Sequence, residues 1–275
     1  MKSEEREPIV QPLCPLPPDQ QSAIERLQQQ CFVELATVQQ FHHWLDDKRQ
    51  SRQACRSIGD SRTGKTIACE SYRLKYATPS TTGDCPLVPV IYWHATTETG
   101  QRELFVGLLE QMKYRVTHGT IADLRERVYR LLKACQVEMI LLDEAHRFRP
   151  KTFSEIRDIF DLLGIAVVLV GTDRLDAVVR RDEQVHHRFM SCHRFHRFDS
   201  QALEDTTAIW EEHVLKLPQP SHLTSAPMQK VLGASTRGYL GVLDEILRTA
   251  ARRALQNGKT RIDLTLLSQV ALEYK

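Results

Sequence analysis

The chain has 275 residues, of which 41% are hydrophobic and 26% charged, a composition typical of a globular protein with a buried core. The formal net charge of +2 gives no argument for nucleic-acid binding, so any basic surface has to be local. No apolar run approaches the roughly 20 residues that cross a bilayer, and the first residues do not resemble a signal peptide. Seven cysteines without a C-x-x-C pair indicate reduced thiols, and we expect a cytoplasmic protein with no membrane partner.

In chain order, residues 1–18 are polar and rich in proline, which predicts a flexible arm. Residues 19–50 have helical periodicity and are expected to form helices that pack on the part that follows. Between residues 51 and 199, apolar β-branched runs alternate with helical segments. This alternation predicts an α/β core with a five-stranded parallel sheet between helices. Residues 200–275 show only helical patterns, which predicts a small all-helical C-terminal lid.

The expected strands are QACRSI, LVPVIYWHA, VEMILLDEAHR, IAVVLVGT and CHRFHRF. Thr120 is expected to be the N-cap of a helix, with Asp123 completing a capping box, and Gly164 is expected to end the helix TFSEIRDIFDLLG. The expected lid helices are ALEDTTAIWEEHVLKL, APMQKVLGAST, YLGVLDEILRTAARRAL and LTLLSQVALEYK.

A glycine-rich loop follows the first expected strand. Its sequence, GDSRTGKT at residues 59–66, fits the phosphate-binding pattern G-x-x-x-x-G-K-[ST] between a strand and a helix. Backbone N–H groups of such a loop and of the helix N-terminus bind phosphate oxygens. Lys65 is expected to reach the β- and γ-phosphates of ATP, and Thr66 to ligate Mg²⁺. The expected ATP-binding residues are Gly59, Asp60, Ser61, Arg62, Thr63, Gly64, Lys65, Thr66 and Asp143.

Two acids at the end of the third expected strand supply the other half of an ATP site. Asp143 is expected to hold Mg²⁺ and Glu144 to polarise the attacking water. Thr172, at the end of the fourth strand, is expected to bind that water or the γ-phosphate; the alternative is that it caps the next helix. Arg188 is a candidate arginine finger for a neighbouring subunit, or else an exposed arginine at a helix end.

Two other motifs are misleading. DEAH at residues 143–146 is spelled like a helicase signature, but such helicases need two α/β domains and this chain has room for one. The histidines and cysteine of HHRFMSCHRFHRF, residues 186–198, alternate along a strand and lack metal-ligand spacing. We therefore expect neither a helicase nor a metal site in this segment.

Taken together, GDSRTGKT, VEMILLDEAHRFRPKTFSEIRDI, LGIAVVLVGTDRLDAVVRRDEQVHHRF and GYLGVLDEILR resemble the AAA+ ATPases of the TnsC/TniB group of transposition regulators. The small size resembles TnsC of CRISPR-associated transposons with a single effector nuclease (type V-K). The resemblance runs from about Leu35 to the C-terminus and implies a AAA+ core with a helical lid.

The resemblance also implies a function. Family members use ATP to assemble into rings or helical filaments on double-stranded DNA. They link a target-selection complex, consisting of a TniQ-type adaptor and an RNA-guided effector, to the transposase TnsB, whose stimulation of ATP hydrolysis disassembles the filament. The family's DNA contacts fall on Arg102 and Thr120 here, with Lys113, Arg115 and His118 nearby; the alternative is an ordinary solvated helix face.

One residue departs from the family pattern. In GYLGVLDE the family commonly has an arginine that senses the γ-phosphate, where this chain has Val242. Either Arg237, Arg248 or a neighbouring subunit's arginine replaces it, or hydrolysis is slow and regulatory.

The sequence leaves three other functions open. A AAA+ helicase loader would bind single-stranded DNA and a replicative helicase. A P-loop small-molecule kinase would transfer phosphate to an acceptor without DNA. A scaffold would bind nucleotide without turnover.

Overall fold

The computed structural model describes residues 18–29, 31–77, 86–115 and 118–274. All but the last residue of the expected arm, residues 1–18, lies outside them. The chain forms two compact units. The core unit comprises residues 32–200 and 237–241, and the helical unit comprises the residues up to 31 together with 201–236 and 242–275.

The core unit is built on one parallel sheet. Its strands are β1 (Ala54–Gly59), β2 (Val90–His94), β3 (Met139–Asp143), β4 (Ala166–Gly171) and β5 (Cys192–Phe195). Their order across the sheet is β2-β3-β4-β1-β5. The three central strands are buried along their whole length, as expected for a parallel sheet covered on both faces. The predicted fold class, an α/β core with a five-stranded parallel sheet, is confirmed.

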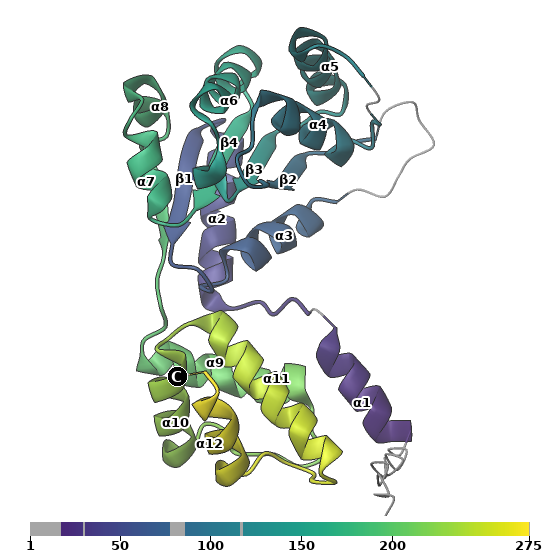
Figure 1. Ribbon diagram of the computed structural model, residues 1–275, viewed down its shortest axis with the longest axis vertical. Helices are drawn as coiled ribbons and strands as arrows, with labels where there is room; N and C mark the ends of the chain where they lie inside the picture. The colour runs from purple at the N-terminus through teal and green to yellow at the C-terminus, as the bar shows by residue number, and fades with distance from the viewer. Residues whose placement is uncertain (1–17, 30, 78–85, 116–117, 275) are drawn as a thin grey trace, which may run out of the picture. The chain divides into compact units, whose positions relative to one another are not determined.

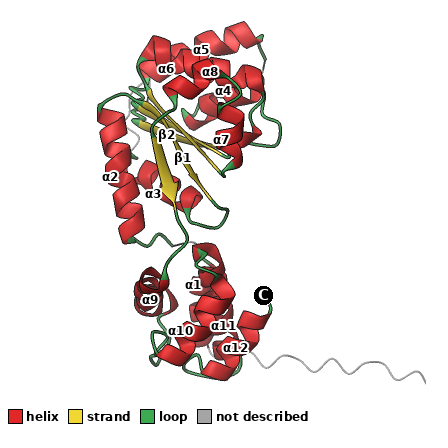
Figure 2. Cartoon of the chain, turned by 90° about the vertical axis from the view of Figure 1, so that its left-hand side faces the viewer, coloured by secondary structure: helices red, strands yellow, loops and turns green. Residues whose placement is uncertain are grey.

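Helices cover both faces of this sheet (Figures 1 and 2). One face carries α2 (Ala36–Gln50) and α3 (Lys65–Lys75). The other carries α4 (Gln101–Gln111), α5 (Ile121–Ala134), α6 (Pro150–Leu163), α7 (Arg174–Val179) and α8 (Glu183–Arg188). A short 3₁₀ helix, η1 (Ala145–Arg147), follows β3. Thr120 caps α5 with Asp123 in a capping box, and Gly164 ends α6 in the left-handed conformation, as predicted.

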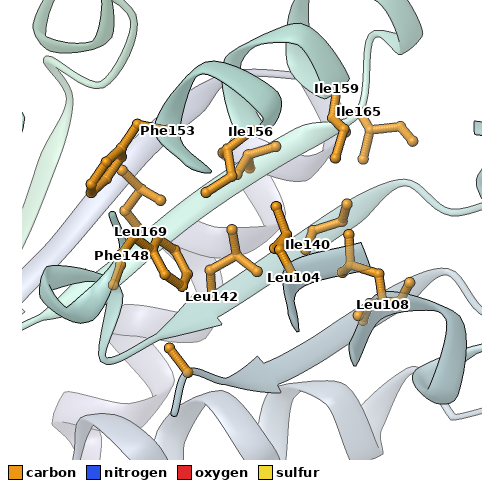
Figure 3. Packing of buried hydrophobic residues seen from close by; sticks show 14 of the residues in the cluster. Leu104, Leu108, Ile140, Leu142, Phe148, Phe153, Ile156, Ile159, Ile165 and Leu169 are labelled. Carbon is orange, nitrogen blue, oxygen red and sulfur yellow. The ribbon is translucent and has the colours of Figure 1, made fainter. Parts of the chain in front are cut away.

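The main hydrophobic core lies between the sheet and the second group of helices (Figure 3). Leu104 and Leu108 of α4 pack in the same cluster as Ile140 and Leu142 of β3. Alternate residues of a strand face the same side, and residues four apart share one face of a helix, so these spacings place all four side chains in one layer. This layer holds the carboxyl end of β3, with its acids, in a fixed position.

The opposite face has an aromatic cluster. The ring of His193, on β5, lies 5.0 Å from that of Phe41 and 5.3 Å from that of Trp44 on α2, centroid to centroid. Phe195 packs edge-on against His193 at 5.2 Å. The edge strand β5, expected from CHRFHRF, therefore packs on α2 through its aromatic rings.

The helical unit has α1 (Pro18–Gln28), α9 (Ser200–Ile209), α10 (Ala226–Thr236), α11 (Leu240–Gln256), α12 (Leu264–Leu272) and a π-helical segment, η2 (Trp210–Leu215). The single helix expected over ALEDTTAIWEEHVLKL thus changes to π-helical hydrogen bonding at Trp210. The helix α1 groups with this unit rather than with α2, because Arg26 donates to the carbonyl of Leu215 over 2.9 Å. Across the described ranges, no helix combines the length and apolar character needed to span a bilayer.

Candidate nucleotide-binding site

The glycine loop, residues 59–66, connects the end of β1 to the start of α3. A Cβ atom at Gly59 would lie 2.6 Å from the carbonyl oxygen of Phe195, so only glycine lets β1 approach β5 this closely. Gly64 has a φ of 94° and is the N-cap of α3. The loop therefore turns directly into a helix N-terminus, whose first N–H groups have no acceptor within the helix and suit an anion.

Lys65 is 5% exposed, and its ammonium group lies inside the loop. Its Nζ donates to the carbonyl oxygens of Gly59 over 2.8 Å and Asp60 over 2.6 Å. Burial lowers the pKa of Lys65, and the charges of Asp143 and Glu144 oppose that effect. The amine is thus bonded to the loop and is close enough to the two acids for their charges to act on it.

Asp143 is fully buried at the end of β3, and its carboxylate contacts side chains of two other elements, α3 and β2. Its Oδ2 accepts from the hydroxyls of Thr66 over 2.7 Å and Tyr92 over 3.0 Å, and lies 3.4 Å from Nδ1 of His94. Burial would raise the pKa of Asp143, but these bonds and the N–H of Glu144 outweigh it and hold the pKa below its ordinary value. A charged carboxylate beside a hydroxyl is a donor set that fits Mg²⁺.

Glu144 and Thr172 lie at the same edge of the sheet, after β3 and β4. Glu144 has a φ of 55°, a left-handed conformation that is uncommon outside glycine. The side-chain oxygen of Thr172 is buried and has no hydrogen-bond partner in the described structure. The N-cap of α7 is Asp173, and Thr172 makes no capping bond. A buried hydroxyl without a partner fits a group that waits for a ligand.

Two of the remaining loop residues, Asp60 and Arg62, form hydrogen bonds with residues outside the loop. Asp60 Oδ2 accepts from Arg197 Nε over 2.8 Å and from the Tyr239 hydroxyl over 3.2 Å. The carbonyl of Arg62 accepts from the N–H of Gly241 over 2.9 Å. Thr63 donates to the carbonyl of Asp60, and Ser61 is exposed. The expected ATP-binding residues of the loop are therefore contiguous, but Asp60 and Arg62 also bind Arg197, Tyr239 and Gly241 of the same core unit.

The candidate arginine finger, Arg188, lies on α8, and its guanidinium is engaged by a carboxylate of the same unit. Arg188 forms an ion pair with Asp161 on α6, with Nη2 2.7 Å from Oδ2. Val242 lies in the first turn of α11. Arg248, which was expected as a substitute for the missing sensor arginine, donates instead to Asp244 over 2.7 Å and to the carbonyl of Leu27 over 2.7 Å.

A second region, the basic cleft, has a volume of about 580 Å³. Its lining residues are Gly100, Gln101, Arg102, Glu103, Ile121, Arg149, Pro150, Lys151 and Thr152. The N-termini of α4, α5 and α6 all contribute to it, and three of its side chains are cationic. These three cations favour phosphate, whereas the N-termini of α4 and α5 are capped by Glu103 and Asp123, which accept from the N–H groups of Gly100 and Thr120.

The structure brings together only part of the predicted DNA-contact set. Arg102 lines the basic cleft and donates to the carbonyl of Gly119 over 2.7 Å, next to Thr120. Lys113 and Arg115 follow the far end of α4, which at 11 residues is about 16 Å long, and are not among the lining residues. Their contact with DNA stays a prediction.

Sequence reasoning missed several neighbours of these sites. Tyr92 and His94 were not predicted, although β2 pairs with β3 so that His94 lies opposite Asp143. Polar residues at the carboxyl end of a second buried strand were the available signal. Arg149 and Lys151 were also missed; their signal was a pair of cations at the start of a helix. Within the described ranges, no group of three or more His, Cys, Asp or Glu side chains is placed to hold a metal ion.

The fold resembles solved structures of Cdc6 and ORC proteins. Cdc6p from Pyrobaculum aerophilum aligns with a TM-score of 0.70 and 16% identity, covering 91% of this chain and 70% of that one. ORC1 of Aeropyrum pernix, solved in complex with DNA, aligns with a TM-score of 0.67 and 16% identity, covering 91% of this chain and 69% of that one. At this identity the likeness shows the fold alone, which is that of AAA+ ATPases of the Cdc6/ORC type.

Comparisons of the amino-acid sequence with known proteins assign this chain to a family. The ORC1-type DNA replication protein 1 of Halobacterium salinarum is 25% identical over 137 residues. The matched region is 50% of this chain and 43% of that protein, so the chain spans less than half the length of this curated relative. Residues 24–198 match the model of the family described as Bacterial TniB protein, which is well over half of the chain. The chain therefore belongs to the TniB family of bacterial proteins and has a AAA+ core.

Proposed function

We propose that the protein is a AAA+ ATPase that assembles with ATP on duplex DNA and regulates transposition. In this role it links a target-selection complex, formed by a TniQ-type adaptor and an RNA-guided effector, to the transposase TnsB. The carrying observation is that Lys65, Thr66, Asp143, Glu144 and Thr172 gather at one edge of the sheet beside a glycine loop. Membership of the TniB family supports the role in transposition.

Each of these residues has one task in hydrolysis. The N–H groups of the loop and Lys65 bind the phosphates, and Lys65 exchanges the carbonyls of Gly59 and Asp60 for phosphate oxygens. Thr66 and Asp143 would hold Mg²⁺, which neutralises charge on the phosphates. Glu144 accepts a proton from the attacking water. Val242 at the sensor position suits slow, regulatory turnover.

The hydroxyl of Thr172 orients the attacking water, because its oxygen is buried at the same sheet edge and has no partner in the described structure. Arg188 completes the site of a neighbouring subunit once it leaves Asp161. Hydrolysis then depends on contact between subunits, which ties turnover to assembly.

The basic cleft is the proposed duplex-binding surface. Arg102, Arg149 and Lys151 supply charge, and the N-terminus of α6, which no acidic side chain caps, supplies N–H groups; both contact phosphates without reading bases. The related ORC1 of Aeropyrum pernix was solved with DNA, which is consistent with a DNA-associated role for this chain.

Electron microscopy and fluorescence anisotropy on duplex DNA test the proposal. We expect oligomers with ATP or a non-hydrolysable analogue and none with ADP. The double variant Arg102→Ala, Lys151→Ala should weaken binding. It should also lower the salt dependence by about one unit of log–log slope for each phosphate that the variant no longer binds. Arg130→Gln, on the exposed part of α5, is the matched control.

Other results would identify another function. Absence of oligomers with ATP and duplex DNA would overturn the proposal. Preference for single strands would indicate a helicase loader, and phosphate transfer to a small acceptor without DNA would indicate a kinase. Glu144→Gln should trap stable assemblies, whereas a scaffold without turnover would behave the same with and without this change.

A further inference from the structure

A buried carboxylate lies beneath the basic cleft. Glu155, in the second turn of α6, is 4% exposed and contacts side chains of two other helices. Its Oε2 accepts from Nε of Arg125 on α5 over 2.8 Å, and its Oε1 accepts from Nη2 of Arg125 and from Nε2 of Gln101 on α4. One acidic side chain on α6 therefore connects the three helices whose first residues line the cleft.

These three residues lie within one helical turn of the cleft lining. Gln101 is itself a lining residue and is the first residue of α4. Arg125 comes four positions after Ile121, and Glu155 comes four positions after Lys151. Ile121 and Lys151 both line the cleft. Residues four apart share one face of a helix and are neighbours along it, so the Arg125–Glu155 pair lies directly below the lining residues.

A second link joins the starts of α4 and α6. The carbonyl of Thr99, a fully buried residue before α4, accepts from the hydroxyl of Thr152 over 3.1 Å and from the N–H of Arg149 over 3.0 Å. Thr152 and Glu155 are three positions apart on α6, so they too are neighbours along that helix. A shift of α6 along α4 would therefore break polar bonds at two successive levels of the interface.

Stability alone does not account for the carboxylate of Glu155. A buried ion pair can often be replaced by apolar residues without loss of stability, because removing charges from water costs free energy that their attraction only partly returns. The side chain of Glu155 is 5% exposed and that of Arg125 is 39% exposed, so the acid has lost most of its hydration. Its negative charge also opposes phosphate above it. What the pair contributes is geometry, because a two-pronged arginine–carboxylate contact fixes both distance and orientation.

We propose that Glu155 is a positioning residue for duplex binding. Through Arg125 and Gln101 it holds the first turns of α4, α5 and α6 at the spacing at which the cationic lining residues contact phosphates of one duplex at the same time. The inference rests on the proposed function, since it takes the basic cleft as the duplex-binding surface. A cleft fixed in this way binds without first losing conformational freedom, whereas a loosened cleft keeps its cations and loses that advantage.

Glu155→Gln separates geometry from charge, because the two effects have opposite signs. The change removes a negative charge below the phosphates, so charge alone would tighten duplex binding. We expect instead that duplex affinity falls by about tenfold, as for the loss of one hydrogen bond to a charged group. Fluorescence anisotropy on duplex DNA with a non-hydrolysable ATP analogue measures it.

Two further variants complete the comparison. Glu155→Asp keeps the charge but is one methylene shorter and cannot reach both partners, so it should also weaken duplex binding. Glu126→Gln makes the same change in charge at an exposed residue of α5, whose carboxylate pairs only with Arg130 among the described residues. This matched control should bind the duplex at least as tightly as the wild type. Affinity for the ATP analogue without DNA should be unchanged in all three variants.

Duplex affinity of Glu155→Gln at or above that of the wild type would overturn the inference, and so would wild-type affinity in Glu155→Asp. A parallel loss of affinity for the analogue without DNA would indicate a general loss of structure and would also overturn it. A wild type that does not bind duplex DNA would overturn the proposed function as well.

Should Glu155→Gln not fold, Arg125→Lys tests the same pair from its more exposed side. Lysine keeps the positive charge but cannot form the two-pronged contact with the carboxylate. Duplex affinity should therefore fall although the charge of the cleft is unchanged. Wild-type affinity in Arg125→Lys would again overturn the inference.

Discussion

The hydroxyl of Thr66 donates a hydrogen bond to Asp143 Oδ2 over 2.7 Å, joining residues 77 positions apart in the chain. This bond connects the first turn of α3 to the end of β3. The two halves of the proposed Mg²⁺ site are therefore already adjacent. Both oxygens are of the hard type that Mg²⁺ prefers as ligands.

Thr66→Val should remove the effect of Mg²⁺ on ATP affinity, because the hydroxyl ligand is lost while the shape of the side chain is kept. Titration of a fluorescent ATP analogue with Mg²⁺ and with a chelator measures it. Thr63→Val, in the same loop but bonded to the carbonyl of Asp60, should keep the Mg²⁺ dependence. An equal enhancement by Mg²⁺ in Thr66→Val would show that Thr66 is not a ligand.

Thr172→Val should slow hydrolysis by about tenfold or more without lowering stability. The oxygen of Thr172 is buried with no partner in the described structure, so its removal relieves a desolvation cost of about 1–3 kcal/mol. Thermal unfolding and steady-state ATP hydrolysis measure the two effects. The control is Thr207→Val, the same change at a buried threonine of α9, which should leave hydrolysis unchanged. Normal turnover in Thr172→Val would remove Thr172 from the site.

The histidine of the aromatic cluster should make folding sensitive to acid. Burial, with a smaller contribution from His196, lowers the pKa of His193 from its ordinary value of 6.5. The folded state therefore binds fewer protons at His193 than the unfolded state does. The contribution of the neutral histidine to the free energy of unfolding is fully present above pH 6.5 and is lost as the pH falls through the folded-state pKa.

Replacing this histidine should reduce the acid sensitivity. His193→Phe should narrow the difference in Tm between about pH 7.5 and about pH 5.5, on either side of the ordinary histidine pKa. His42 and His146, whose pKa values burial also lowers, leave a residual difference. An unchanged difference in Tm would contradict the role of His193.

Gly59→Ala should destabilise the fold, by about 1–3 kcal/mol as for other overpacked sites. The new Cβ would lie 2.6 Å from the carbonyl oxygen of Phe195, and backbone must move to admit it. The matched change is Gly233→Ala, at a position inside α10. There the new Cβ would meet only the side chain of Leu203 on α9, at 3.9 Å. Helix propensity predicts that this change stabilises by about 1 kcal/mol. Chemical denaturation measures both, and equal effects would refute the packing argument.

Local chemistry made much of the fold predictable. The five strands, the Thr120 capping box and the end of α6 at Gly164 follow from patterns confined to a few residues. The π-helical segment from Trp210 was missed, because its change of hydrogen-bond register has no residue-type signature. The grouping of α1 with the helical unit was also missed, since it depends on Arg26 meeting a carbonyl 189 positions away.

The candidate site divides in the same way. The positions of the glycine loop after β1 and of the two acids after β3 were predictable, because the pattern G-x-x-x-x-G-K-[ST] requires a strand before it and a helix after it. Phosphate binding by these residues stays a prediction. The contacts of Glu144 with His146 and Arg147, and of Asp143 with Tyr92, were not predictable. They depend on side-chain directions at the sheet edge, which only the packed sheet determines.

The glycine loop also has neighbours that phosphate chemistry does not require. Asp60 binds Arg197 and Tyr239, and the carbonyl of Arg62 accepts from the N–H of Gly241. Arg197 lies just before the chain leaves the core unit at residue 200, and Tyr239 and Gly241 lie in the short segment where it returns. A chimera carrying another ATPase's loop would keep Gly59, Gly64, Lys65 and Thr66 but would not form these bonds. Such a graft should bind nucleotide, but nucleotide binding should have little effect on residues 197, 239 and 241. The residues at the unspecified positions of the loop pattern, Asp60 and Arg62, are therefore specific to this protein's architecture.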